Sequence, residues 1–388
     1  MSGLHCGLIS IVTSFVVVVA LEVTNEALYE VSFELGNEEE LILLYSYPNS
    51  DTSNQTLRET VEHYLTQVVE RDLIENGLVD VSVSVARDVP MRGDVYSVTI
   101  TGDSHQIKEY SILMTKFLEN GKSALQGVEK LKAVGKWNEE EWRMFLPLGL
   151  AICNHRSVQL LHFPPDYSLP QQDYLGSKTS KRWEELLLLN NVPQSEVTLY
   201  ETILDIAPIA APASAGSQLK ETYIYFQPYV LKMLPFLVEN KGKTLPMVAY
   251  GGPVCKWVME FFKLQNFGVN SVDVIKIGEL TVPVLGANHP SYIWYAKDDG
   301  REKAFKVVEQ DLISACWQAR MSNDPSLQLS NVLQECQQYW KEPPRPMKVC
   351  VAMEKQAYGL SQSEAIKNCR NDFPGDISRD TSSQKIEL

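Results

Sequence analysis

The feature that most constrains the fold of this chain is an alternation of short apolar segments with helical patterns between residues 142 and 320. Short apolar strands that alternate with helices predict a mostly parallel sheet with helices on both faces. We therefore expect a three-layer α/β/α domain over 142–320. The expected strands are Val158–His162, Val197–Ile206, Leu245–Gly251, Val272–Ile277 and Val282–Gly286, and the expected helices are Lys181–Asn190, Thr222–Glu239, Pro253–Lys263 and Lys303–Arg320.

A second unit is expected before this domain, over residues 28–125. Glu40–Tyr47 has the composition of a strand, and apolar residues in 57–69 recur at helical spacings. Val79–Val85 alternates strictly, a further strand follows near 95–100, and 106–118 has a helical pattern. This β-α-β-β-α order predicts a small α+β unit. It contains no chemical motif, so we expect it to bind or to act as a scaffold.

The two ends of the chain leave its location open. Within the N-terminal segment 1–27, the apolar run Gly7–Leu21 is shorter than the roughly 20 residues of a membrane-spanning helix, so no stable span is expected. It reads as a buried strand, or alternatively as a secretory signal that lacks a preceding basic residue. The C-terminal extension, 321–388, has a polar end typical of disorder and finishes Lys385–Leu388, which is similar to an endoplasmic reticulum retention signal. The expected location is nuclear or cytoplasmic, with the endoplasmic reticulum lumen as the alternative.

The charge distribution and the cysteine spacing argue against several classes of binding site. The net charge is −14, yet residues 143–320 hold 17 basic and 17 acidic residues, so the acidity lies in the flanks and the central domain is neutral. Tight binding to a phosphate backbone needs clustered Lys and Arg, which argues against strong nonspecific DNA binding. The seven cysteines form no zinc-type spacing, so we expect no metal and reduced thiols. No glycine-rich phosphate loop is present, so no cofactor is expected. The oligomeric state is not indicated.

Three strand-end segments carry the candidate chemistry. They are Ser157–Pro170, Leu199–Gly216 and Val282–Ala296. Ligands of parallel sheets bind beyond the carboxyl ends of the strands. We therefore expect the three segments to converge, with a pocket lined by Phe163, Asp166, Asp205 and His289.

The order of these motifs resembles that of the uracil-DNA glycosylase superfamily, and in style its single-strand-selective monofunctional branch. In that family, a first strand ends in a water-activating loop, a second in a base-reading Asn or N-x-C-P-L, a third in Gly before a helix, and the last in H-P-S. Asp205–Ile209 is similar to N-x-C-P-L, Met247–Gly252 before the Pro253–Lys263 helix is similar to the strand–Gly–helix unit, and His289-Pro290-Ser291 matches H-P-S. The resemblance covers about 180 residues.

The resemblance implies roles for particular residues. His289 would stabilise the departing base. The substrate-binding positions would be Phe163, Tyr167, Asp205, Pro208 and Ser291. Aligning Pro165 on the proline of the first loop places Pro164 where the family has its water-activating residue, which leaves Asp166 or His162 as the base. Asp205 replaces the base-reading Asn, and an ionised carboxylate offers no hydrogen-bond donor.

Each of these residues also has a purely structural interpretation. His289 can make a loop hydrogen bond, Asp166 can form a turn and Asp205 can cap a helical turn. The aromatic residues Tyr292, Trp294 and Tyr295 suit either the core or base stacking. Two basic clusters are expected to be solvated surface: Lys241 with Lys243, and Lys178 with Lys181 and Arg182.

Two functions follow. One is a base-excision N-glycosylase that acts on a flipped base in single-stranded or damaged DNA, with weak or lost activity. The other is a non-catalytic binding or scaffold protein that retains the glycosylase fold.

Overall fold

The computed structural model describes residues 31–35, 40–47, 82–88 and 94–101, and 112–373 apart from 114–115, 118, 122, 139–140, 145–153, 164–177 and 201. The apolar run 7–21, the helical pattern 57–69 and the C-terminal 374–388 lie outside the described residues. The chain divides into two compact units, residues 1–74 with 78–119, and residues 75–77 with 120–388. Within the described part, no helix is both long and apolar enough to cross a membrane.

The first unit contains a four-stranded antiparallel sheet. Its strands are β1 (Val31–Leu35), β2 (Glu40–Tyr47), β3 (Ser82–Asp88) and β4 (Asp94–Thr101), in the order β1-β2-β4-β3. The predicted strand at Glu40–Tyr47 is confirmed, whereas β1 was not predicted.

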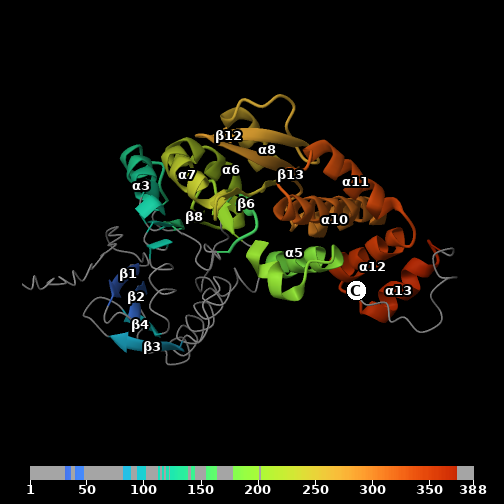
Figure 1. Cartoon of the computed structure of the whole chain (residues 1–388), viewed down its shortest axis with the longest axis horizontal. Coiled ribbons are helices and arrows are strands. Elements are labelled where there is room, and N and C mark those ends of the chain that lie inside the picture. Colours follow the sequence, from blue (N-terminus) through green and yellow to red (C-terminus); the bar gives the residue numbers. More distant parts are fainter. Residues whose placement is uncertain are drawn as a thin grey trace, which may run out of the picture. The chain divides into compact units, whose positions relative to one another are not determined.

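The second unit is built on a five-stranded, mostly parallel sheet. Four strands are parallel: β6 (Val158–Leu161), β7 (Ile203–Asp205), β11 (Met247–Tyr250) and β13 (Leu280–Ala287). The fifth, β12 (Val272–Ile277), pairs antiparallel with β13 at one edge, giving the order β12-β13-β11-β6-β7. This confirms a mixed α/β fold with a mostly parallel sheet (Figure 1).

Helices cover both faces of this sheet, as the alternation of side chains along β11 shows. Val248 and Tyr250 pack in one core with helices α5 (Lys178–Leu189) and α10 (Arg301–Asn323). On the opposite face, the Cys255 thiol of α8 (Gly252–Phe261) donates to the Ala249 carbonyl at 3.4 Å. Helix α7 (Tyr223–Leu237) packs against β7.

Three further helices, α11 (Leu329–Lys341), α12 (Arg345–Tyr358) and α13 (Gln362–Arg370), follow α10 and share its core. Two disulfides connect them: Cys316–Cys336 joins α10 to α11, and Cys350–Cys369 joins α12 to α13. The expectation of reduced thiols is therefore wrong for these four cysteines. Sequence spacing missed the pairs because helix packing, which brings them together, leaves no local signature.

One predicted strand is wrong in its first half. The sequence pattern predicted a strand over Val197–Ile206, but Gln194–Tyr200 forms the 3₁₀ helix η1 and the strand begins at Ile203. Val197 and Tyr200 are both buried, and their spacing of three is the period of a 3₁₀ helix. The remaining elements are α3 (Ser123–Ala133), β5 (Arg143–Met144), β8 (Ile209–Ala210), η2 (Ala213–Ala215), α6 (Gly216–Lys220), β9 (Glu239–Asn240), β10 (Lys243–Thr244), α9 (Tyr292–Ala296) and η3 (Lys297–Asp299).

Candidate functional site

The candidate site lies at the carboxyl edge of the parallel strands. Leu161 pairs with Asp205 across β6 and β7, and Tyr250 pairs with Ala287 across β11 and β13. The segments that leave these strands begin at His162, Ile206, Gly251 and Asn288, so they start along one edge. The strand register therefore places the three motif-bearing strand ends along one edge of the sheet, while the pocket lined by Phe163, Asp166, Asp205 and His289 stays a prediction.

His162, which follows β6, uses both of its ring nitrogens. The Tyr223 hydroxyl lies 2.5 Å from Nδ1, and Nε2 lies 3.1 Å from the Gly216 carbonyl. Burial raises the pKa of Tyr223 well above its usual value, so the phenol is the donor to Nδ1. Nε2–H then donates to the carbonyl, and burial lowers the pKa of His162, which favours this neutral form. His162 therefore has no free nitrogen with which to activate a water.

Asp205 is a fully buried carboxyl group at the end of β7. Neither of its oxygens has a hydrogen-bond partner in the described part of the chain, so it caps no helical turn there. Burial raises its pKa to about 8, because no opposite charge compensates the ionised form. Asp205 is thus mainly protonated at neutral pH. A protonated carboxyl group presents one donor and one acceptor, the same pair as the amide of Asn.

His289 follows β13 and presents a donor. Its Nδ1 lies 2.7 Å from the Ser291 hydroxyl and accepts from the Ser291 backbone N–H at 3.2 Å. The pKa of His289 is lowered to about 4, mainly by burial, with smaller contributions from His162 and the positive charge of Arg182. The ring is therefore neutral, with its proton on Nε2. Gly251 has a φ of +85°, which favours glycine, and a Cβ there would lie 3.5 Å from the His289 Cβ.

A buried charge network holds the loop that carries His289. Arg182 of α5 donates to the Pro290 carbonyl and to Asp311 of α10, and its Nε donates to Gln356 of α12 at 3.1 Å. Asn288 donates to the other oxygen of Asp311 at 3.4 Å. The Arg182 and Asp311 side chains are 2% and 3% exposed, so neither charge is solvated. Arg182, which itself contacts α10 and α12, thereby holds the backbone next to His289 in place.

The interpretation of Arg182 as solvated surface is thus wrong, although Lys181, Lys241 and Lys243 are exposed as expected. A signal was present in the sequence. Arg182 precedes Leu186 by four residues, which places it on the buried face of α5. Charge alone suggested a surface position, and the partner Asp311 lies 129 residues away.

The other predicted site residues fall into three groups. Phe163 packs edge-on against His162, with ring centroids 4.5 Å apart, and Pro208 is buried just after β7. Asp166 and Tyr167 lie outside the described residues. Of the three aromatic residues after H-P-S, Trp294 packs against the core, whereas Tyr292 and Tyr295 are 37% and 67% exposed.

Comparison with known proteins adds no assignment, because no family model, no curated protein and no solved structure matches the chain. The resemblance therefore rests on motif order together with this geometry. Among the described residues, Cys350, Glu354 and Cys369 have the spacing of a metal site, but the two sulfurs are bonded to each other and cannot act as thiolate ligands.

The protonated state of Asp205 predicts how stability depends on pH. The folded pKa of about 8 lies above the unfolded value of about 3.9, so the native state holds the extra proton. Stability from this group is complete below about pH 4 and is lost as pH rises to about 8. We expect Asp205→Asn to match the wild type near pH 4 and to exceed it at pH 8 by a few kcal/mol.

Urea unfolding between pH 4 and pH 9 measures this difference. Asp298→Asn, at an exposed position, controls for the loss of one carboxylate. A difference between Asp205→Asn and the wild type that stays constant across this range contradicts the protonated state.

Proposed function

We propose that the carboxyl edge of the second unit's sheet binds one nucleobase, and that the chain is a divergent uracil-DNA glycosylase-like protein with weak or lost excision activity. The observation that carries the proposal is that Asp205 ends β7 and His289 follows β13 in one mostly parallel sheet, and that both side chains are neutral hydrogen-bond donors. A site of neutral donors suits an uncharged ligand with carbonyl oxygens better than a phosphate, which is bound by Lys and Arg.

The chemistry of Asp205 supports a lactam edge as the ligand group. Uracil presents a carbonyl acceptor next to an N–H donor. A protonated carboxyl group can donate to the carbonyl and accept from the N–H, as an Asn amide does. The replacement of the family's Asn by Asp205 is therefore compatible with reading uracil while the proton is retained, and binding should weaken as pH rises above about 8.

The protonation of His289 supports stabilisation of a departing base. A neutral imidazole that donates through Nε2–H can stabilise negative charge that develops on the leaving base. Ser291 keeps the proton on Nε2 because it donates to Nδ1. This arrangement needs no imidazolium, so it persists at neutral pH.

Two observations support weak or lost turnover. His162 has both nitrogens engaged, and Pro164 cannot act as a base. A general base contributes roughly 10²–10⁴-fold to such a step.

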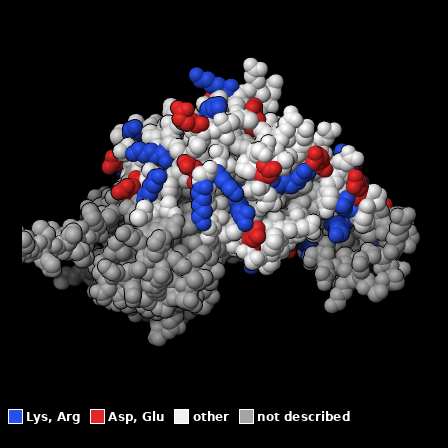
Figure 2. Space-filling model, in the orientation of Figure 1, with Lys and Arg blue, Asp and Glu red and all other residues white. Residues whose placement is uncertain are grey.

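The face in Figure 2 carries Lys and Arg interspersed with Asp and Glu among the described residues, so it offers no continuous basic stripe for DNA. Weak, salt-sensitive binding to single-stranded or damaged DNA is the expected behaviour.

A glycosylase assay on single-stranded DNA that contains uracil tests this proposal. We expect binding without appreciable turnover, and any residual excision should fall about 10²–10³-fold in His289→Ala because a leaving-group donor is lost. Tyr295→Ala tests base stacking separately from chemistry.

Two results would revise the assignment. Multiple-turnover excision that Asp166→Asn abolishes would make Asp166 the base. Absence of any base-dependent binding would favour the non-catalytic scaffold protein.

A further inference from the structure

A cavity lies at the opposite end of the sheet from the candidate base site. It has a volume of about 500 Å³ and lies between α11, the floor formed by α10, and the segment that joins α5 to η1. Asn190, the residue after the end of α5, lies eight residues beyond Arg182, and Arg320 lies nine residues beyond Asp311 on α10. At 1.5 Å per residue, these separations are roughly 12–14 Å. The two sites are therefore distinct.

The walls of this cavity are held rigidly. The Cys316–Cys336 disulfide joins its floor to α11. Asn190 donates to the Leu186 and Leu312 carbonyls at 2.8 and 3.0 Å, and it accepts from the Trp340 indole at 3.1 Å. A cavity fixed in this way loses little entropy when a ligand binds, which favours binding of a small molecule.

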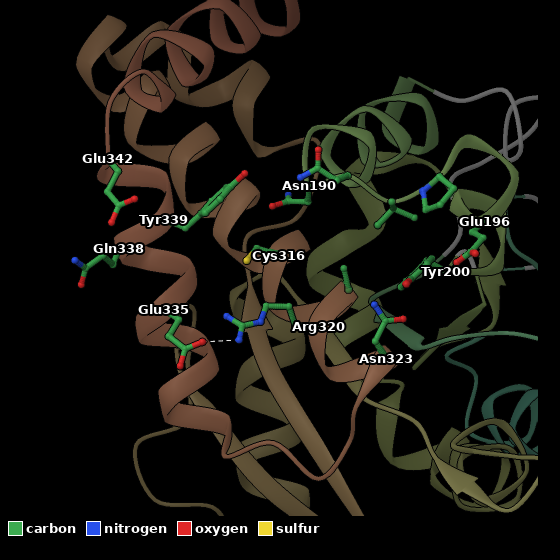
Figure 3. A pocket seen from close by; sticks show the side chains of 14 residues that line it. Asn190, Glu196, Tyr200, Cys316, Arg320, Asn323, Glu335, Gln338, Tyr339 and Glu342 are labelled. Carbon is green, nitrogen blue, oxygen red and sulfur yellow. Dashed lines mark ion pairs between the residues drawn. The ribbon is translucent and has the colours of Figure 1, made fainter. Parts of the chain in front are cut away.

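Every charged side chain that lines the cavity already has an ion partner. The Arg320–Glu335 pair joins α10 to α11 across the cavity (Figure 3). The other two carboxylates, Glu196 and Glu342, pair with Arg156 and Arg345 at 3.3 and 3.0 Å. With Glu196, Glu335 and Glu342 against Arg320, the lining disfavours an anion, and the existing partners of the carboxylates reduce their attraction for a cation, so a neutral ligand is favoured.

The groups that remain for a ligand are amides and a phenol. The side chains of Asn191, Asn323 and Gln338 make no hydrogen bond within the described part of the chain, and Tyr200 contributes its ring and hydroxyl. Each amide offers both donors and an acceptor. Burial raises the pKa of Tyr200 to about 12, so its hydroxyl keeps its proton. Figure 3 shows Gln338 on one wall and Tyr200 and Asn323 on the other.

The shape of the cavity argues against a peptide. A strand-like peptide needs a free sheet edge, and none of the residues that line this cavity belongs to a strand. A helical peptide needs a row of apolar anchor pockets, but the apolar lining is limited to Val192, Pro193, Ala319 and the disulfide-bonded Cys316 besides the aromatic rings. A compact ligand rich in hydroxyl groups fits better, because each hydroxyl both donates and accepts.

We propose that this cavity binds a neutral saccharide of about two sugar units, held by the side chains of Asn191, Asn323, Gln338 and Tyr200. The proposal is independent of the base site. Since each hydrogen bond to the sugar replaces one to water, we expect a Kd on the order of 1 mM.

The test is a nuclear magnetic resonance titration of the full chain with two neutral disaccharides, maltose and N,N′-diacetylchitobiose. Binding of either should shift the side-chain amide signals of Asn323 and Gln338. Asn323→Ala and Gln338→Ala should each weaken binding about threefold to tenfold. Asn331→Ala is the matched control, because Asn331 is an exposed α11 amide outside the cavity that donates to Gln328.

The result that overturns the proposal is equally direct. It is wrong if neither sugar shifts these signals when the sugar concentration is about ten times the expected Kd. That concentration would occupy most of the sites. It is also wrong if spermidine binds there more tightly than both sugars, since the cavity would then select a cation.

Discussion

Replacing Arg182 with methionine is expected to lower the free energy of unfolding by about 3–5 kcal/mol, because the carboxylate of Asp311 would remain buried without its partner. Asp311 is 3% exposed, and Arg182 also supplies the donors for Pro290 and Gln356. Methionine keeps much of the volume of the side chain, so the effect comes from lost charge and hydrogen bonds more than from a cavity. Urea unfolding at pH 7 measures it.

Two further variants separate the charge effect from general damage to α5. Lys181→Met changes the adjacent, exposed residue, and we expect it to alter stability by less than about 0.5 kcal/mol. The double variant Arg182→Met/Asp311→Leu removes both charges and should recover much of the lost stability. Equal destabilisation in the single and double variants would show that the ion pair is not the cause.

The same network sets the state of His289. The positive charge of Arg182 helps to hold the pKa of His289 near 4. In the folded double variant, the pKa of His289 should therefore be higher. The imidazole signals of His289, followed by nuclear magnetic resonance, measure this shift. Arg182 would then be a positioning residue for the base site, acting through Pro290 and through its charge.

The layout of the parallel sheet could be predicted from the sequence. Its strands are covered by helices on both faces, so each strand is a short run of apolar residues. Val272–Ile277 was placed correctly, and the helices of this domain were placed to within a few residues. Tertiary packing defeated the rest. Val197 was assigned to the predicted strand Val197–Ile206. It lies instead in a 3₁₀ helix, where it and Tyr200 are both buried at a spacing of three residues.

The candidate site was predictable only as a set of strand ends. Parallel strands place their carboxyl ends together, so Asp205 and His289 could be assigned to one edge. Their protonation could not be predicted, because it depends on burial and on partners far away in the sequence. Tyr223 lies 61 residues from His162, and Arg182 lies 108 residues from Pro290. The cavity near Arg320 gave no signal, since its polar residues resemble ordinary surface.

Reduction of the two disulfides should destabilise the second unit by about 3 kcal/mol for each bond. Cys316 and Cys336 are 20 residues apart, and Cys350 and Cys369 are 19 apart. Closing loops of this length restricts the unfolded chain by about that free energy. Thermal unfolding with and without a reductant measures the loss. Cys255→Ala is the control, because this buried cysteine forms no disulfide and its effect should be the same in both conditions.

Alkylation of the denatured, unreduced protein decides whether the bonds form. Mass spectrometry should find Cys255 alkylated and Cys316, Cys336, Cys350 and Cys369 protected. The outcome also separates the two expected locations, because structural disulfides persist in oxidising compartments and are rare in the cytosol and nucleus. Protection in protein isolated from its natural source would favour the lumen of the endoplasmic reticulum. Complete alkylation of all four would contradict both disulfides and restore the expectation of reduced thiols.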